Sequence, residues 1–381
     1  MASGAKNGSS ILPRDIKIKT NGGMKGFKYK INIALQGAVS SLIYAFYFSF
    51  SKIAIKKKIF CDAIFSGTTM HILCDGRVSC SCRDTTGEFN LGNTLHQPIF
   101  EIWQGEKYSA LRHSFIENKI PHKICTTCPS FRFVDRRKIK YDIASFPTGI
   151  YFENTAACNL NCFACKRDVI AKKRSVFVMP KEKAQKLLNE IASLGKPLNS
   201  FAILGQGEPF LDDNFCYYVK IIKEKMPGCH VFTSTNGICL DGADKIKKII
   251  GSGIDRIVFS IDGATKKSYL KYQTGGDFDK AIENMKRFVA VREEMHSKTP
   301  EIVWQYILFR WNDSCKEMRA AENMARDIGV DRLVFHTTMV PILCISIRSI
   351  LFVLTRLFQF IKKEKNISLI SNYEFNFNNK I

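Results

Sequence analysis

The chain has 381 residues, and its 57 Lys and Arg against 35 Asp and Glu give a formal net charge of +22. This length excludes a miniprotein with one small core and allows a large domain with a smaller module. This charge favours anionic partners such as nucleic acid or a phospholipid surface. Lysine is abundant in every part of the chain, however, so general residue usage explains the charge at least as well, and we do not expect nucleic acid as a partner.

Fourteen cysteines raise the question of disulfides. Disulfide frameworks belong to small secreted domains, and the N-terminal region has no signal peptide with a small-residue cleavage site. We therefore expect a reducing, cytoplasmic location, where clustered cysteines are metal ligands and isolated ones are buried small hydrophobic residues. The isolated cysteines are Cys216, Cys229, Cys239, Cys315 and Cys344.

Residues 1–60 are predicted to form a basic leader. Residues 1–30 are rich in Gly, Ser, Asn and Lys, whereas residues 31–51 are uncharged and have lysines on both sides. About twenty such residues could span a bilayer, but Asn32, Gln36 and several Ser dilute the segment. The pattern favours a helix on the anionic inner face of a membrane, or a helix docked on the protein's own surface.

Residues 61–140 combine clustered cysteines with Gly, Thr and Asp turn signals. This composition is typical of a small module organised by a metal. The cysteines are Cys61, Cys74, Cys80, Cys82, Cys125 and Cys128.

Residues 146–338 alternate short apolar runs with amphipathic stretches about six times. This repeat predicts an α/β fold with a parallel sheet and crossover helices, whose active site is built by loops at the carboxyl ends of the strands. Residues 339–381 read as an amphipathic, basic tail. The expected helices cover residues 181–194, 214–225, 243–250, 279–291 and 315–328.

Three cysteines follow the first predicted strand of this repeat. Cys158, Cys162 and Cys165 stand in the segment CNLNCFAC, at spacings of four and three residues. Thiolates so spaced can converge on one iron-sulfur cluster and leave its fourth iron without a protein ligand. A structural zinc site would normally have four ligands, and no nearby Cys or His supplies the fourth.

Over residues 146–336 the chain resembles the radical S-adenosylmethionine (SAM) superfamily, whose signature CxxxCxxC follows the first strand of a partial (βα)6 TIM-like barrel. The segment Gly205-Gln206-Gly207-Glu208-Pro209 is similar to the family's GGEP motif. The resemblance implies that Glu208 and the neighbouring backbone receive the methionyl ammonium of SAM, and a carboxylate suits that charge.

Two later strand ends are also similar to family motifs. They supply Ser234 and Asn236 after the third strand and Ser260 and Asp262 after the fourth. The resemblance places Ser260 and Asp262 near the ribose or the methionyl carboxylate. The chain departs from the family where Tyr272-Gln273 replaces an Arg found in many peptide-modifying relatives.

The upstream cysteine segment resembles the SPASM or Twitch module, which binds an auxiliary cluster. Its landmarks are DGRVSCSC, LGN, EIW and CTTCP in the family's order, although the family normally places this module after the barrel. The implied ligands of a second [4Fe-4S] cluster are Cys61, one of Cys80 or Cys82, Cys125 and Cys128, with Cys74 in reserve. A zinc site is the alternative.

The resemblance implies an oxidoreductase that cleaves SAM to a 5'-deoxyadenosyl radical. An external one-electron reductant of the flavodoxin or ferredoxin type would supply the electron, and the radical would take a hydrogen atom from a peptide or carbohydrate-like substrate. No catalytic acid or base can be assigned. The alternatives are an RNA-modifying radical enzyme, for which the charge of +22 is the motive, and a degenerate iron-sulfur protein for electron transfer or scaffolding.

Overall fold

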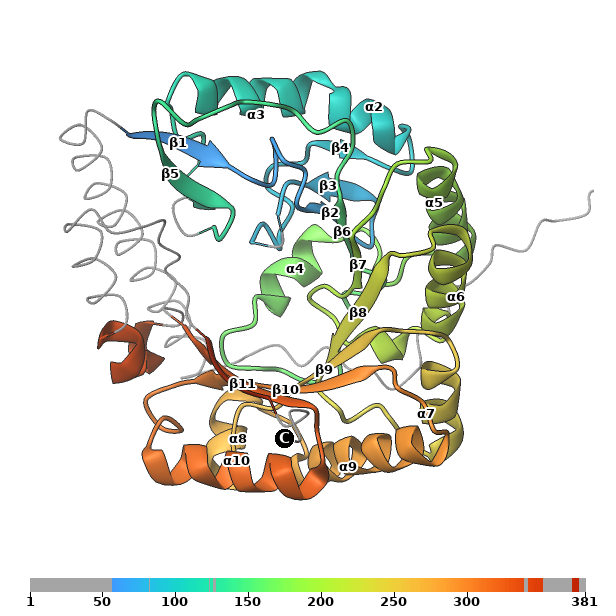
Figure 1. The fold of residues 1–381 in the computed structure, drawn as a ribbon, viewed down its shortest axis with the longest axis vertical. Helices are drawn as coiled ribbons and strands as arrows, with labels where there is room; N and C mark the ends of the chain where they lie inside the picture. The colour runs from blue at the N-terminus through green and yellow to red at the C-terminus, as the bar shows by residue number, and fades with distance from the viewer. Residues whose placement is uncertain are drawn as a thin grey trace, which may run out of the picture.

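The computed structural model describes residues 57–81, 83–122, 124–125, 128–338, 342–351 and 372–376 (Figure 1). Residues 1–56 of the predicted leader, with its membrane-surface helix, therefore lie outside the described residues, as do Cys82 and most of the predicted tail. Residues 57–60, predicted as part of the leader, instead belong to the first strand of the cysteine-rich module. Within those ranges, no helix combines the length and the apolar character that a membrane span requires.

A ten-stranded sheet organises the described chain, in the order β12-β11-β10-β9-β8-β7-β6-β2-β3-β4. The strands from β6 to β11 are consecutive in the chain and pair in parallel, as the repeat predicts. Their carboxyl ends therefore lie at one edge of the sheet. These strands are β6 (Gly149–Phe152), β7 (Ser200–Ile203), β8 (His230–Thr235), β9 (Arg256–Ser260), β10 (Glu301–Leu308) and β11 (Arg332–Thr337); β12 (Asn372–Asn376) is antiparallel to β11.

The predicted amphipathic stretches form the main connecting helices. Figure 1 shows these helices on the outer side of the strands, with the short α4 on the inner side. The main helices are α5 (Lys181–Ser193), α6 (Phe215–Lys225), α7 (Ala243–Ile250), α9 (Phe278–Glu294) and α10 (Cys315–Ile328); the short ones are α4 (Arg167–Lys173), α8 (Lys266–Tyr272), η2 (Pro209–Leu211) and η3 (Ile342–Cys344).

Local sequence explains where these helices begin, end and pack. Helix α5 buries Ala184, Leu187, Leu188 and Ile191, whose spacing places them on one helix face. Helix α10 begins after Ser314, whose hydroxyl accepts a hydrogen bond from the Glu317 N–H at 3.2 Å. It ends at Gly329, where a φ of +83° favours glycine.

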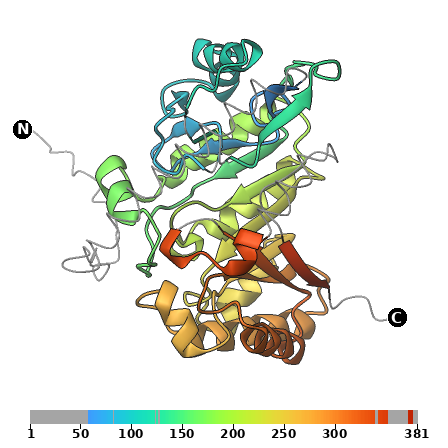
Figure 2. The same ribbon diagram turned by 90° about the vertical axis from the view of Figure 1, so that its left-hand side faces the viewer.

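The cysteine-rich module extends the same sheet with three of its strands. Its strand β2 (Met70–Ile72) pairs in parallel with β6, and β3 (Arg77–Ser79) and β4 (Gly92–Asn93) follow in antiparallel order. Figure 2 shows this module, coloured blue to teal, at the end of the molecule opposite the orange C-terminal helices. The pairing brings the module's turns next to the end of β6.

A second, smaller sheet and two helices complete the module. Strand β1 (Lys57–Cys61) pairs antiparallel with β5 (Phe131–Asp135), and α2 (Ile99–Gln104) precedes α3 (Glu106–Ile116). Arg112 on α3 is buried and donates to the carbonyls of Ile64 at 2.8 Å and Trp103 at 3.0 Å. Its guanidinium also lies 4.3 Å from the Trp103 ring centre, so one cation joins both helices to the turn after β1.

Candidate functional site

The three cysteines after β6 lie together. Cys158, Cys162 and Cys165 are half-buried, and burial raises the pKa of Cys158 to about 11. Burial also raises the pKa of Cys162 well above its ordinary value, and the nearby sulfurs of Cys165 and Cys158 add to that shift. Coordination to iron would lower these thiol pKa values, because a coordinated thiol is deprotonated. Three convergent thiols are a donor set that fits an iron-sulfur cluster.

The loop between β6 and α4 carries the three cysteines and is called the triad loop below. Hydrogen bonds hold this loop from two sides. The Asn161 N–H donates to the carbonyl of Thr274, just after α8, at 3.0 Å, and the Phe163 N–H donates to the carbonyl of Tyr272, the last residue of α8, at 2.8 Å. Arg167 donates to the carbonyl of Cys158 at 2.7 Å and also to that of Leu160. The sequence analysis missed Arg167, for which the only signal is its place two residues after the last cysteine.

The loop after β7 approaches the triad loop through two glycines. A Cβ on Gly205 would lie 2.3 Å from Cγ of Glu153, and one on Gly207 would lie 2.3 Å from the carbonyl oxygen of Thr155. The next N–H, that of Glu208, donates to the carbonyl of Ala157 at 2.7 Å. Glycine is therefore required at 205 by the Glu153 side chain and at 207 by the backbone that follows β6.

The Glu208 carboxylate joins the loop after β7 to the loop after β8. Its Oε1 accepts from the Thr235 hydroxyl at 2.7 Å, and its Oε2 accepts from the Asn236 N–H at 2.8 Å. The side chain is buried, and burial raises its pKa to about 7 against the opposing effect of these hydrogen bonds. A role toward the methionyl ammonium stays a prediction.

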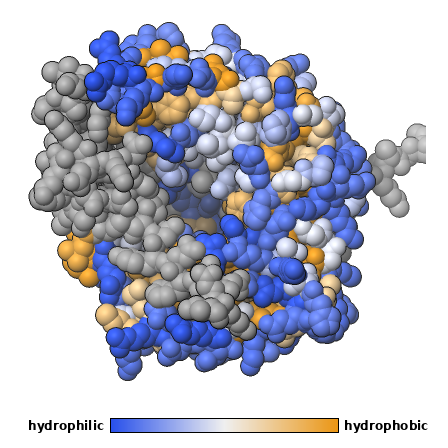
Figure 3. Space-filling model, viewed as in Figure 1, coloured by the Kyte–Doolittle hydropathy of each residue, from blue (hydrophilic) through white to orange (hydrophobic). Residues whose placement is uncertain are grey.

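The carboxyl ends of β8 and β9 also lie near the triad. Asn236 donates from Nδ2 to Oδ1 of Asn159, inside the triad loop, at 2.8 Å. The hydroxyls of Ser234 and Ser260 lie 2.7 Å apart. The structure therefore brings Ser234, Asn236 and Ser260 to the same edge as the cysteines. The face drawn in Figure 3 is hollowed near its centre, where hydrophilic residues gather.

Asp262 has a buried carboxylate at the end of β9. Its Oδ1 accepts from the Ile307 N–H at 2.7 Å, and burial raises its pKa to about 7. Gln273 is buried, and it accepts from the Asp262 N–H at 2.8 Å while it donates to the Ser260 carbonyl at 2.8 Å. Gln273 therefore fixes the backbone of this loop, a role that the sequence did not reveal.

The second group of cysteines lines one cavity of about 20 Å³. A site needs about 10–15 Å³ by this measure to hold one water, so the cavity is larger than a single water. Burial raises the pKa of Cys61 and of Cys125 to about 12, and the neighbouring Cys128 adds to both shifts. Four thiols around one cavity fit a cluster with four cysteine ligands. The four are Cys61, Cys80, Cys125 and Cys128.

The other predicted ligands lie elsewhere. Cys74 does not line this cavity, and its thiol donates to the Val176 carbonyl at 3.2 Å. Cys82 lies outside the described residues. Among the side chains that the structure describes, no three Cys, His, Asp or Glu form a group that could hold a single metal ion. A four-iron cluster binds each thiolate through a different iron, so its ligands stand farther apart than those of one zinc ion.

Ser81 is predicted to tune a cluster in this cavity. Its hydroxyl lies 3.4 Å from Sγ of Cys128, and a thiolate there could only accept a hydrogen bond. Hydrogen bonds to cluster sulfurs favour the reduced state. We expect Ser81→Ala to lower the auxiliary cluster's reduction potential in an EPR redox titration. Ser114→Ala, which removes an exposed hydroxyl on α3, should leave the potential unchanged, and equal effects of both would contradict the assignment.

Two family models match the chain. A model of the radical SAM superfamily matches residues 153–297, which contain the triad and the loops after β7, β8 and β9. A model of an iron-sulfur cluster-binding domain, SPASM, matches residues 61–129. The second match confirms that this module lies upstream of the first.

Similarity to individual proteins covers parts of the chain. An AdoMet-dependent heme synthase of Methanosarcina barkeri is 29% identical over 137 residues, which are 36% of this chain and 37% of the relative. A probable GTP 3',8-cyclase of Methanocaldococcus jannaschii is 28% identical over 142 residues, 36% of this chain and 44% of the relative. The chain thus spans less than half the length of these relatives. The crystal structure of archaeal TYW1 gives a TM-score of 0.34 at 17% identity, over 55% of this chain and 74% of that chain.

The α/β sheet carries three cysteines after β6, at the carboxyl edge of its parallel strands, and four further cysteines line a separate cavity in the upstream module. The two family matches support a radical SAM enzyme that carries a SPASM module. Its cofactors are [4Fe-4S] clusters and SAM.

Proposed function

We propose that this protein cleaves SAM reductively and uses the radical to remove a hydrogen atom from a peptide or carbohydrate-like substrate, for an oxidative modification. The strongest support is that the triad loop contacts the loops after β7 and β8. The Glu208 N–H donates to the Ala157 carbonyl, and the Asn236 side chain donates to that of Asn159. When bound, the cluster supplies the electron that divides SAM into methionine and the 5'-deoxyadenosyl radical.

The chain's own residues bind and orient in this scheme. Cys158, Cys162 and Cys165 hold the cluster and leave one iron for SAM. Residues 205–207 offer backbone to the methionyl ammonium, and the charge of Glu208 favours it. Because Glu208 also holds the backbone of the loop after β8, it fixes the relative position of both loops. Ser260 and Asp262 are proposed to contact the ribose or the methionyl carboxylate.

We also propose that β6 to β11 form a partial (βα)6 barrel. Six consecutive parallel strands with their main helices on the outer side support this architecture (Figure 1). In Figure 1 the strands also turn markedly between β8 and β10. Such a barrel would direct the triad and the strand-end loops toward its mouth, where the substrate would bind.

The upstream cavity is proposed to be the site of a second cluster, which would supply an electron acceptor for the oxidation of the substrate. Cys61, Cys80, Cys125 and Cys128 are its proposed ligands, and their support is the shared cavity. An external flavodoxin or ferredoxin would reduce the first cluster. The strands of this module continue the main sheet, so the two cluster sites share one framework.

The test is product formation from SAM alone. Anaerobically reconstituted protein, reduced with dithionite and mixed with SAM, is expected to release 5'-deoxyadenosine and methionine in equal amounts, measured by liquid chromatography and mass spectrometry. Unreduced protein is the control and should release neither. Absence of both products from the reduced protein, with clusters present, would favour an electron-transfer or scaffold protein.

A further inference from the structure

A fully buried ion pair lies beside the triad loop and has no part in the proposed chemistry. Arg174, at the end of α4, donates from Nε to Oε1 of Glu153, at the end of β6, at 3.0 Å, and neither side chain is exposed. Burial of two charges is costly unless the geometry is good and the remaining donors and acceptors are satisfied. The other hydrogen bonds of Glu153 and Arg174 therefore show which segments of the chain this pair holds together.

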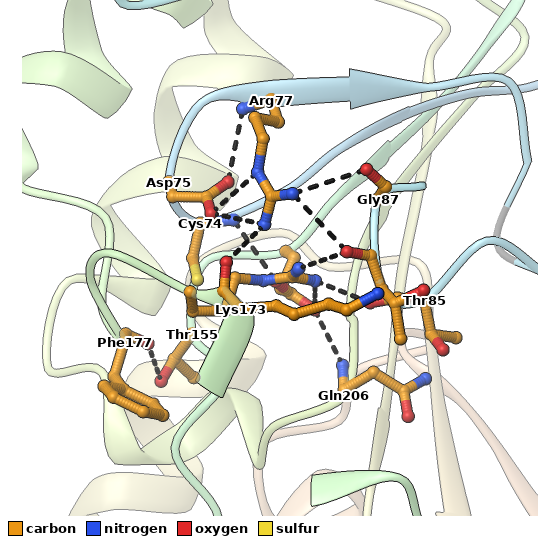
Figure 4. A network of polar contacts seen from close by, with 12 residues as sticks. Cys74, Asp75, Arg77, Thr85, Gly87, Thr155, Lys173, Phe177 and Gln206 are labelled. Carbon is orange, nitrogen blue, oxygen red and sulfur yellow. Dashed lines mark hydrogen bonds and ion pairs between the residues drawn. The ribbon is translucent and has the colours of Figure 1, made fainter. Parts of the chain in front are cut away.

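Both side chains reach segments that are far apart in the sequence. Glu153 accepts from the N–H groups of Cys74 at 3.2 Å and Gln206 at 3.1 Å. Arg174 donates to the carbonyls of Thr85 at 2.7 Å and Thr86 at 3.4 Å. Figure 4 shows Cys74, Thr85 and Gln206 around the centre of this network. Two segments of the upstream module and the loop after β7 thus meet on one ion pair.

The contact with the loop after β7 is steric as well as polar. The Glu153 side chain lies against Gly205, where a Cβ would be 2.3 Å from its Cγ and 2.6 Å from its Oε2. Since Oε2 also accepts from Gln206, the carboxylate fixes both the position and the direction of this backbone. These are the residues whose backbone is proposed to meet SAM.

A second arginine, on the module's strand β3, also joins the module to the end of α4. Arg77 forms an ion pair with Asp75 at 2.8 Å and donates to the Lys173 carbonyl at 2.8 Å, one residue before Arg174 (Figure 4). Its Nη1 also donates to the carbonyls of Gly87 at 3.3 Å and Thr86 at 3.5 Å. The turn that receives these bonds begins near Asp84, which lines the auxiliary cavity.

We propose that the Glu153–Arg174 pair is a positioning device that seats the SAM-binding loop on the upstream module. Glu153 and Arg174 are positioning residues, because their contacts are to the protein and act through residues 205 and 206. The upstream module therefore sets the geometry of the SAM site in addition to holding its own cluster. This inference rests on the proposed binding of SAM at that loop.

The test compares two buried arginines. Arg174→Lys keeps the charge but cannot bond Glu153 and both carbonyls with one planar fork. We expect it to weaken SAM binding to the reconstituted, full-length protein on the order of tenfold, measured by anaerobic titration calorimetry, with iron and sulfide content unchanged. Arg292→Lys is the matched control, because Arg292 pairs with Asp331 in a largely buried site between α9 and the start of β11. It should leave the SAM Kd unchanged.

A double variant covers the case in which Arg174→Lys does not fold. Glu153→Gln with Arg174→Met removes both charges and leaves no unpaired ion, a change that buried pairs often tolerate. It should also weaken SAM binding while iron content is kept. Unchanged SAM affinity in either folded variant would overturn the inference, and so would a loss of iron that accounts for the weaker binding. If the parent protein itself bound no SAM, that result would contradict the proposed function. A parent that binds SAM together with a folded variant that binds it equally well would contradict only the role of this ion pair.

Discussion

Replacement of Cys158, Cys162 and Cys165 together by Ala is expected to halve the iron content of the reconstituted protein, from about eight irons per chain to about four. The three thiols supply the protein ligands of one proposed cluster, so their loss removes that cluster entirely. Formation of 5'-deoxyadenosine should fall to background, because SAM then has no iron to bind. Iron and sulfide assays together with product analysis measure both effects.

The complementary variant separates the two cluster sites. Replacement of Cys61, Cys80, Cys125 and Cys128 by Ala should also leave about four irons, but the protein should still cleave SAM. Cys315→Ala is the control, since this cysteine is exposed and stands alone in the sequence. A triad variant that kept about eight irons would show that the cysteines after β6 are not cluster ligands.

Gly207→Ala is expected to weaken SAM binding by at least about tenfold, which corresponds to about 1.4 kcal/mol. The added Cβ would lie 2.3 Å from the Thr155 carbonyl oxygen and 2.5 Å from that of Ala157. Both atoms belong to backbone, so the loop after β7 must move away from the triad loop. Anaerobic titration of SAM into the reconstituted variant measures the change, and the iron content should match that of the parent.

The control for this change is another glycine that tolerates a side chain. Gly251, after α7, has a φ of −67°, and its added Cβ would approach one carbonyl oxygen at 3.1 Å. Gly251→Ala should leave SAM binding at the parent value. If Gly207→Ala bound SAM as tightly as Gly251→Ala, close packing of these two loops would not be needed for the cofactor.

The parallel part of the fold could be predicted because its periodicity is strong. The expected helices 243–250 and 315–328 coincide with α7 and α10, and residues 181–194 differ from α5 by one residue. Helix α8 was missed because it has only seven residues. A signal was present, since the Thr265 hydroxyl accepts from the Ser268 N–H at 3.2 Å in a capping box.

The junction between the module and the main sheet could not be predicted. Strand β2 has three residues, too few for a period to identify its partner, yet its pairing with β6 decides where the module sits. The Glu153–Arg174 pair joins residues 21 positions apart, and its bond to Cys74 spans 79. Such contacts depend on tertiary packing. The same packing directs Cys80 into the auxiliary cavity and Cys74 toward Val176.

The most direct measurement is an EPR spectrum of the triad cluster with and without SAM. The variant without Cys61, Cys80, Cys125 and Cys128 isolates this cluster, and dithionite reduces it. Our account predicts a single reduced [4Fe-4S] signal whose g values and line shape change when SAM is added, because SAM binds the iron that Cys158, Cys162 and Cys165 leave open. A signal that SAM leaves unchanged at saturating concentration would contradict it.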